Sequence, residues 1–394
     1  MKTVRIAAKQ NEIVIVAERR KPRFARVWQV PSPSKRDAPR TSALLQTACN
    51  NDVRLIQSYF AVKPRFSFAD IASRPSGLLI WQPGILGYNR KVAPHPVSAQ
   101  RAVRVIHRNV FHNDSLTPIE KVRLSPGQAG IICGWGIFTT MRISRGEAFA
   151  YERHWRRLEK DASIIRLPMP YSAAKVRLHL HEVIRANKVE SGAARVYLIN
   201  NNVGFWQSDE ARPETDLIIY TASLPEYREP IKLDLREHGR HAGSPLAGVK
   251  STSWLPNVWA VAEAQKAGFD EVVLLNERGE VAECTAANIF IVKNGKVYTP
   301  PLNSGCLEGV TRGILFEIAP EAGVPVIEQL LKPDDLYGAD EVFISSTNRN
   351  LIGVGEIAGN KIANAPGKFT RQLDELFDAH VADYVTRRQA TASR

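Results

Sequence analysis

The sequence predicts a mixed α+β protein whose folded body has two lobes, residues 107–225 and 249–394, connected by a joint at 226–248. Three observations lead to this prediction. Short runs of alternating apolar and polar residues, typical of half-buried strands, recur between stretches with apolar residues at helical spacing. Proline and glycine are concentrated in the joint. The composition, with 44% hydrophobic and 24% charged residues in 394, is that of a globular protein with a large core.

The first 106 residues differ from the rest in charge. They hold 19 Lys and Arg against 5 Asp and Glu, whereas residues 107–394 hold 34 against 35. We interpret residues 1–106 as a basic, proline-rich extension that is weakly ordered. The alternative is an arm that binds nucleic acid or a membrane surface, but the basic residues follow no helical face and do not alternate with aromatic residues that could stack on bases. We therefore expect no nucleic-acid partner.

The sequence also argues against membrane, export and metal-binding segments. No run approaches the ~18 to 20 apolar residues of a membrane-spanning helix. The apolar run at Ile13–Ala17 is shorter than the ~7 to 15 residues of a secretory core. The four cysteines lie far apart, with no C-x-x-C pair and no histidine at metal-ligand spacing. We expect a cytoplasmic protein with reduced thiols, no membrane partner and no metal.

In the first lobe, apolar and aromatic residues at helical spacing predict a helix at Tyr151–Ile165, which the following prolines end, and a second at Tyr171–Val189. Alternating runs predict strands at Asn109–His112, Val122–Leu124, Arg195–Asn200 and Asp216–Ala222. Gly130–Ile143 is predicted as a glycine-interrupted strand pair that leads into a turn at Ser144–Glu147.

In the second lobe, glycines mark the ends of the predicted elements. Helices are expected at Val258–Lys266 and Val310–Ala322, each followed by a glycine, and an amphipathic helix at Thr370–Thr386 closes the chain. The predicted strands are Asp270–Asn276, Ala287–Lys293, Lys296–Thr299, Val324–Leu330, Glu341–Ser345 and Leu351–Ile357.

Two features of the second lobe could carry chemistry. Glu283 lies at the end of a strand beside a tight connection, where a carboxylate can act as a general base, ligate a metal or pair with a protonated ring nitrogen. Leu307–Arg312 opens a helix behind a Gly/Ser loop, and the free N–H groups and dipole of a helix start favour an anion such as phosphate. A plain helix start without a ligand is the alternative.

A lysine upstream is a third candidate. Lys250 follows the small residues Ala247 and Gly248, and a close-packed, partly desolvated lysine favours the neutral amine that attacks carbonyl groups. A solvated lysine at a helix start is the alternative. A chemical role for Lys250 is favoured when the lysine, Glu283, an anion-binding helix and a separate arginine are considered as one site.

Several motifs resemble those of the class IV aminotransferases, which use pyridoxal phosphate on fold type IV. The motif E-C-T-A-A-N-I-F at 283–290 is followed by V-Y-T at 297–299 and L-E-G-V-T-R at 307–312. G-W-G-I-F-T-T-M-R at 134–142, H-W-R-R-L at 154–158 and A-G-V-K-S-T at 247–252 occur in the expected order. The resemblance covers residues 107–394 and implies a small α/β lobe and a larger lobe with a barrel-like sheet.

The resemblance also implies roles for individual residues. Lys250 resembles the catalytic lysine that condenses with the cofactor aldehyde and then carries a proton to and from the substrate. Glu283 resembles the carboxylate that keeps the pyridine nitrogen protonated, so that the ring can accept electrons. The residues that correspond to phosphate ligands are Arg157, Val310, Thr311 and Thr347.

Substrate contacts implied by the resemblance are Phe138, Arg142, Arg195 and Trp254, and Arg195 is a candidate for binding a substrate carboxylate. Two positions depart from the branched-chain aminotransferase pattern. Thr139 and Thr140 stand where an acidic residue and a glycine are usual, and Trp254 stands near a usual tyrosine. The F-T-T-x-R and E-C-x-A-A-N patterns are similar to those of aminodeoxychorismate lyases, which eliminate pyruvate on the same fold.

Three functions follow as alternatives. The first is transfer of an amino group between a branched-chain-like or other small or hydrophobic amino acid and a 2-oxo acid. The second is an aminodeoxychorismate lyase of folate synthesis, and the third is a non-catalytic cofactor or nucleic-acid binder. The intact set of Lys250, Glu283, Arg157 and Thr311 argues against the third. The family resemblance further implies a homodimer.

Overall fold

The computed structural model describes the side chains of residues 105–125, 127–201 and 213–391, and the backbone of Ala392 and of three N-terminal strands. The chain divides into two units, Met1–Arg90 and Lys91–Arg394. In the first unit, β1 (Thr3–Lys9), β2 (Glu12–Glu18) and β3 (Arg26–Pro31) pair as an antiparallel sheet. The weakly ordered extension predicted here thus contains three strands, which are rich in β-branched residues. The other predictions for residues 1–104 lie outside the described residues.

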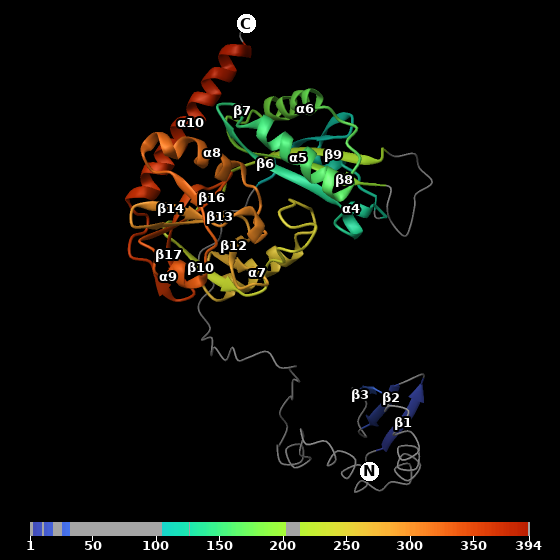
Figure 1. The fold of residues 1–394 in the computed structure, drawn as a ribbon. Coiled ribbons are helices and arrows are strands. Elements are labelled where there is room, and N and C mark those ends of the chain that lie inside the picture. The colour runs from blue at the N-terminus through green and yellow to red at the C-terminus, as the bar shows by residue number, and fades with distance from the viewer. Residues whose placement is uncertain are drawn as a thin grey trace. The chain divides into compact units, whose positions relative to one another are not determined.

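The first lobe of the second unit is an antiparallel sheet with strand order β5-β4-β9-β8-β6-β7, on which α5 and α6 pack (Figure 1). Its elements are β4 (Asn109–His112), β5 (Ser115–Pro118), η1 (Ile119–Lys121), α4 (Ala129–Ile132), β6 (Gly136–Ser144), β7 (Glu147–Ala148), α5 (Tyr151–Ile165), α6 (Ala173–Ala186), β8 (Ser191–Asn200) and β9 (Thr215–Ala222).

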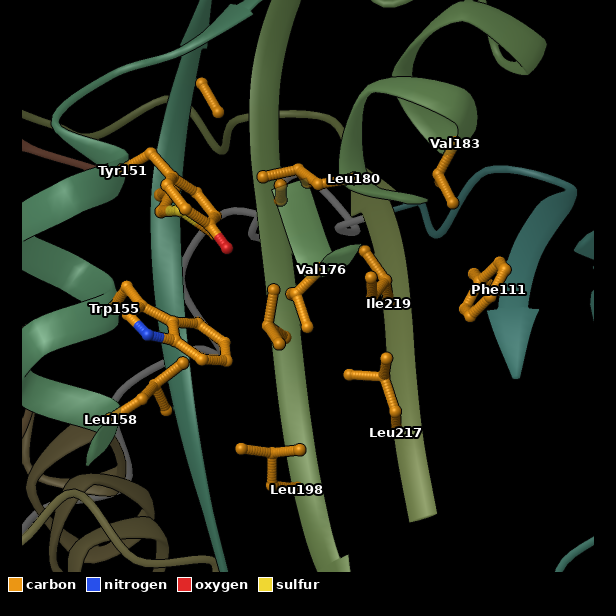
Figure 2. Close-up of a cluster of buried hydrophobic side chains, with 14 of the residues drawn as sticks. Phe111, Tyr151, Trp155, Leu158, Val176, Leu180, Val183, Leu198, Leu217 and Ile219 are labelled. Atoms are coloured by element: carbon orange, nitrogen blue, oxygen red, sulfur yellow. The ribbon is translucent and has the colours of Figure 1, made fainter. Parts of the chain in front are cut away.

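Alternation along the strands gives this sheet two different faces. On one face, Leu198 and Leu217 meet Trp155 and Leu158 of α5 in a buried core (Figure 2). On the opposite face of β6 and β8, Phe138, Thr140 and Arg195 line a cavity. The sheet therefore has a core face and a face towards the candidate site.

The second lobe is a mixed sheet that curls into a half barrel, with strand order β12-β11-β10-β17-β16-β13-β14-β15 and β18 beside β17. Its strands are β10 (Ile231–Arg236), β11 (Glu271–Leu275), β12 (Val281–Cys284), β13 (Asn288–Lys293), β14 (Lys296–Thr299), β15 (Val326–Glu328), β16 (Glu341–Ser346), β17 (Asn350–Ile357) and β18 (Asn360–Lys361). Its helical segments are α7 (Leu255–Lys266), η2 (Leu302–Ser304), α8 (Val310–Ile318), η3 (Ala319–Ala322), α9 (Pro333–Tyr337) and α10 (Lys368–Ala392).

Helices cover this sheet on more than one side. α7 packs on β10 and β11, whereas α8 and α10 pack on each other and on β16. The start of α10 is held by Glu341, whose carboxylate accepts hydrogen bonds from the N–H groups of Phe369 and Thr370 at 3.0 and 2.9 Å. These bonds satisfy donors that a helix start leaves free, and so fix where α10 begins.

The predicted mixed α+β class with two lobes is confirmed, and α5, β4 and β14 have the predicted bounds. Two local predictions are wrong. Val122–Leu124 forms no strand, and Gly130–Ile143 is not a strand pair, because α4 precedes the single strand β6. One helical turn is too short to show a helical period in the sequence.

The predicted joint at 226–248 also contains structure. Ile231, Leu233 and Leu235 alternate along β10, which lies between β11 and β17 and runs parallel to both. The segment therefore contributes a central strand to the second lobe.

No helix in the described part of the chain is both long enough and apolar enough to span a membrane.

Candidate functional site

A cavity of about 560 Å³ lies where both lobes of the second unit contribute side chains. Nine of the ten residues predicted for the site line it: Phe138, Arg157, Arg195, Lys250, Trp254, Glu283, Val310, Thr311 and Thr347. They come from β6, α5, β8, the segment before α7, β12, the start of α8 and the turn between β16 and β17. Segments that are far apart in sequence thus meet around one space.

Arg142 is the exception, because it does not line this cavity. Its guanidinium donates to Asn350 and, at 3.2 Å, to Asp378 of α10. Arg142 shares a face of β6 with Phe138, but it lies at the far end of the strand, where β17 and α10 are close enough to bind its side chain.

Lys250 presents its amine to the cavity. Its Nζ lies 4.7 Å from the centroid of the Phe138 ring. Although the side chain keeps some contact with solvent, burial of the amine, with the charge of Arg157 as a second cause, lowers the pKa of Lys250 from 10.5 to about 7. A large fraction of the amine is therefore unprotonated near neutral pH, as nucleophilic attack on a carbonyl requires.

The backbone of Lys250 is held by the first lobe. Its carbonyl accepts a 3.0 Å hydrogen bond from the N–H of Phe138, and the next residue, Ser251, forms a β-bridge with Ile137. The lysine, which was predicted to open the second lobe, is thus attached to the edge of the β6 sheet.

Glu283 is a buried carboxylate with two fixed oxygens. One oxygen accepts a 2.9 Å bond from Nε of Arg240, and the other accepts a 3.1 Å bond from the N–H of Leu307. Arg240 also donates to Asn257 at 3.0 Å. This network holds a negative charge at the cavity wall, where it can face a protonated ring nitrogen.

A second corner of the cavity suits an anion. α8 begins there with no side-chain cap on its first N–H groups, so these donors and the helix dipole are available to a ligand. The Thr311 and Thr347 hydroxyl-bearing side chains line the same space, and Arg157 donates to the carbonyl of Glu308 at 3.3 Å. A guanidinium beside a free helix start is a strong arrangement for a phosphate group.

Arg157 is oriented by a buried polar pair. Its Nη2 donates to Thr139 Oγ1 at 2.9 Å, and Thr139 lies 2.7 Å from Nδ1 of His154. Because a guanidinium can only donate, the threonine accepts from Arg157. Burial, helped by the charges of Arg157 and Lys250, lowers the pKa of His154 well below 6.5, so the imidazole that contacts Thr139 is neutral.

An aromatic wall covers the other side of the cavity. The Phe138 ring stacks on Tyr197 at 5.2 Å between centroids and meets Trp254 edge-on at 6.1 Å, and Tyr197 stacks on Tyr220 at 5.8 Å. The Arg195 guanidinium lies 5.5 Å from the Phe138 centroid and donates to the Tyr197 hydroxyl at 2.8 Å. No carboxylate of the described residues lies within 4 Å of it.

Several residues in or beside the cavity were not predicted from the sequence. Tyr197, which contacts the cavity residues Phe138 and Arg195, could have been predicted, because residues two apart on a strand share a face and Arg195 was already a candidate. Arg240 and the buried pair of Arg349 and Glu271, joined at 2.9 Å, carry no local signal, because their partners are distant in sequence.

The residues present fit pyridoxal phosphate. A lysine amine with a lowered pKa, a fixed carboxylate and an anion corner match its aldehyde, ring nitrogen and phosphate. Among the residues that the structure describes, no cluster of three or more His, Cys, Asp and Glu could hold a metal ion.

Comparisons with known proteins agree with this chemistry. The family described as amino-transferase class IV matches residues 136–357. A relative from Methanocaldococcus jannaschii, named as a branched-chain-amino-acid aminotransferase, is 31% identical over 275 residues, 68% of this chain and 94% of its own. The D-alanine aminotransferase of Staphylococcus aureus is 29% identical over 287 residues, 70% of this chain and 98% of its own.

Solved structures share the fold. The branched-chain aminotransferase of Escherichia coli, at 25% identity, matches with a TM-score of 0.66 over 70% of this chain and 95% of its own. The Thermoproteus uzoniensis enzyme, at 28% identity, matches with a TM-score of 0.65 over 71% of this chain and 96% of its own. Family match, fold and site together establish that this chain belongs to the class IV aminotransferase family and is a pyridoxal-phosphate-dependent enzyme.

Proposed function

We propose that this enzyme transfers an amino group between an amino acid with a branched-chain-like or other small or hydrophobic side chain and a 2-oxo acid. One observation carries the proposal: the amine of Lys250 faces a wall of aromatic rings that holds one arginine with no acidic partner among the described residues. The rings suit an apolar side chain, and the arginine suits a carboxylate. The names of the relatives point the same way.

Each of the nine predicted residues that line the cavity then has a chemical role. The cofactor, when bound, supplies an electron sink for the bonds to the substrate α-carbon. Lys250 would hold the cofactor through its aldehyde and would carry a proton to and from that carbon, and the carboxylate of Glu283 would favour a protonated ring nitrogen. Arg157 binds the phosphate, together with N–H and hydroxyl groups of Val310, Thr311 and Thr347. Arg195 binds a substrate carboxylate beside Phe138 and Trp254.

A lyase that releases pyruvate from aminodeoxychorismate is the second candidate. The observation in its favour is that Thr140, rather than a glycine, lines the cavity next to Phe138. A further hydroxyl-bearing side chain suits a more polar substrate. A non-catalytic role is set aside, because the family is one of enzymes and the predicted catalytic set lies together in the cavity.

The experiment that separates the two candidates uses the purified, cofactor-loaded enzyme. One reaction contains a panel of amino acids with 2-oxoglutarate, and the other contains aminodeoxychorismate without an amino acceptor. Formation of glutamate from a branched-chain or small hydrophobic amino acid, absent in Lys250→Ala, is the expected result. Release of pyruvate in the second reaction without glutamate in the first would contradict the proposal.

We further propose a homodimer in the cytoplasm. Leu255 and Trp259 of α7 are 77% and 55% exposed near the cavity, and burial of these side chains by a second copy would remove apolar surface from water. The described cysteines Cys133, Cys284 and Cys306 are free thiols, as a reducing compartment would leave them.

A further inference from the structure

A buried acid on α5 touches the backbone of the reacting lysine. The side chain of Asp161 is 1% exposed and lies one helical turn beyond Arg157. Its Oδ2 accepts a hydrogen bond of 3.2 Å from the backbone N–H of Lys250. Asp161 does not line the cavity, so the acid is placed behind the lysine rather than in contact with a substrate.

This bond completes the attachment of Lys250 to the first lobe. The lysine carbonyl already accepts from the N–H of Phe138 at 3.0 Å. With Asp161 on the other side, both polar groups of the Lys250 backbone are bonded, one to β6 and one to α5. The start of the lysine side chain is therefore fixed from two elements that are themselves packed together.

The carboxylate of Asp161 also adds a charge near the Lys250 amine. Four charged groups act on the Lys250 amine: Arg157 and Asp161 from α5, Arg195 from β8 and Glu283 from β12. Glu283 is engaged by Arg240, but no lysine or arginine of the described residues lies within 4 Å of the Asp161 carboxylate. Burial raises the pKa of Asp161, whereas the Lys250 N–H and the charges of Arg157, Lys160 and Lys250 lower it. The charge of Asp161 is thus not consumed by a salt bridge.

We propose that Asp161 is a positioning residue for Lys250: it fixes the lysine backbone and adds a buried negative charge that offsets the two arginines around the amine. Without this charge, Arg157 and Arg195 disfavour the protonated amine more strongly. The lysine must hold a proton at one stage of the reaction and release it at another, so Asp161 sets how readily it does both. This inference rests on the proposed role of Lys250.

The test measures the lysine itself and does not depend on turnover. The full chain without cofactor is labelled with acetic anhydride at a series of pH values, and acetylation of the Lys250 peptide is followed by mass spectrometry. In Asp161→Asn, which keeps an acceptor oxygen but loses the charge, the pH of half-maximal labelling is expected to fall by about 0.5 to 1. Glu159→Gln, an exposed position on the same helix, is the matched control and should leave it unchanged.

Hydrogen exchange at the Lys250 amide tests the backbone contact. Asp161→Ala should speed exchange at least ~10-fold relative to the wild type, and Asp161→Asn should speed it less. An unchanged labelling midpoint in Asp161→Asn overturns the proposal. If the variants do not fold, an unprotected Lys250 amide in the wild type overturns it equally. If these results are negative and Lys250→Ala is inactive, only the role of Asp161 is rejected. If Lys250→Ala is fully active, the proposed function is rejected.

Discussion

The side chains of this site show how burial and charge compete at single residues. Lys250 lies near two arginines and two acids, and desolvation is the largest influence on its amine. Burial also lowers the pKa of His154, so its ring is neutral where it contacts Thr139. At Glu283 the burial of the carboxylate is accompanied by hydrogen bonds from Arg240 and from the N–H of Leu307.

The pH dependence of cofactor capture follows from Lys250. Only the unprotonated amine attacks an aldehyde, so the rate at which the cofactor-free enzyme captures pyridoxal phosphate should rise with pH and be half-maximal near the lysine pKa of about 7. Stopped-flow absorbance measures this rate from about pH 5.5 to about pH 9, a range that extends to both sides of the lysine pKa. A rate that still rises tenfold per pH unit at pH 9 would show an ordinary lysine.

Removal of the Glu283 charge should slow the reaction without emptying the site. In Glu283→Gln we expect kcat to fall about 100-fold or more, because the ring nitrogen loses the anion that favours its protonation, while the phosphate corner is untouched. Steady-state kinetics and a cofactor titration give the two numbers. Exposed Glu321→Gln is the control, and a kcat within about twofold of wild type for Glu283→Gln would contradict this role.

Arg195 should distinguish substrates by charge. Arg195→Gln keeps a donor for Tyr197 but removes the cation, so we expect KM for a substrate that has a carboxylate in contact with it to rise about 10- to 100-fold. Kinetics with 2-oxoglutarate and with a 2-oxo acid that lacks the second carboxylate show which carboxylate is bound. Unchanged KM values for both would rule out a carboxylate contact.

At the scale of elements, packing leaves little space at the start of α8. A Cβ on Gly309, the residue before the helix, would lie 2.0 Å from Oδ1 of Asn288, an atom that cannot move freely because its amide donates to the Leu307 carbonyl at 2.9 Å. The glycine therefore permits the close approach of β13 and α8 that brings free N–H groups to the cavity.

A pair of glycine substitutions on this element tests that reading. Gly309→Ala should displace the helix start and weaken pyridoxal phosphate binding at least about 10-fold, with a lower Tm. Gly313→Ala is the matched control, since a Cβ there meets nothing within 4 Å and alanine favours a helix by about 1 kcal/mol. Equal cofactor affinities in the two variants would show that the start of α8 does not bind the phosphate.

At the scale of the whole molecule, the described residues that line the cavity, from Phe138 to Arg349, all belong to the second unit. Residues 1–106 carry 19 of the basic residues. The last two residues of this segment pair with the first lobe. Ile106 forms a β-bridge with Ala222, and the carbonyl of Val105 accepts a 3.2 Å hydrogen bond from the N–H of Ser223.

Two truncations test where the catalytic body begins. Deletion of residues 1–104 keeps the Ile106 bridge and should leave kcat and Tm unchanged, whereas deletion of 1–106 removes it and should lower Tm by a few degrees, about 1 kcal/mol of stability. Differential scanning calorimetry and the aminotransferase assay measure both. If the protein without residues 1–104 does not fold, part of this segment belongs to the catalytic body.

The mass of the protein in solution tests the proposed homodimer. Light scattering should give twice the chain mass for the wild type, and Leu255→Glu with Trp259→Glu should shift it towards the monomer, because a charge at a buried apolar contact is costly. A wild-type protein that is monomeric at micromolar concentration would contradict the dimer.

Much of the fold could be predicted from the sequence, and so could most of the site. The period of α5 gave its bounds, because fifteen residues with a buried stripe leave a clear pattern. α4 was missed because four residues are too few to show a helical period, and β10 was missed because it pairs with β11 and β17, which are distant in the sequence. Alternation puts Arg142 on the same face of β6 as Phe138, but it does not show at what distance along the strand the cavity ends.

The sequence by itself determined which residue types this protein brings to its chemistry: a lysine among small residues, a carboxylate at a strand end, an arginine on a helix and a glycine before a helix start. Only the tertiary structure decided how they act together. It attached Lys250 to the first lobe through Phe138 and Asp161, and it gave Glu283 a partner in Arg240. The reason is physical, since desolvation and hydrogen bonding depend on neighbours in space, and a local pattern in the chain does not contain them.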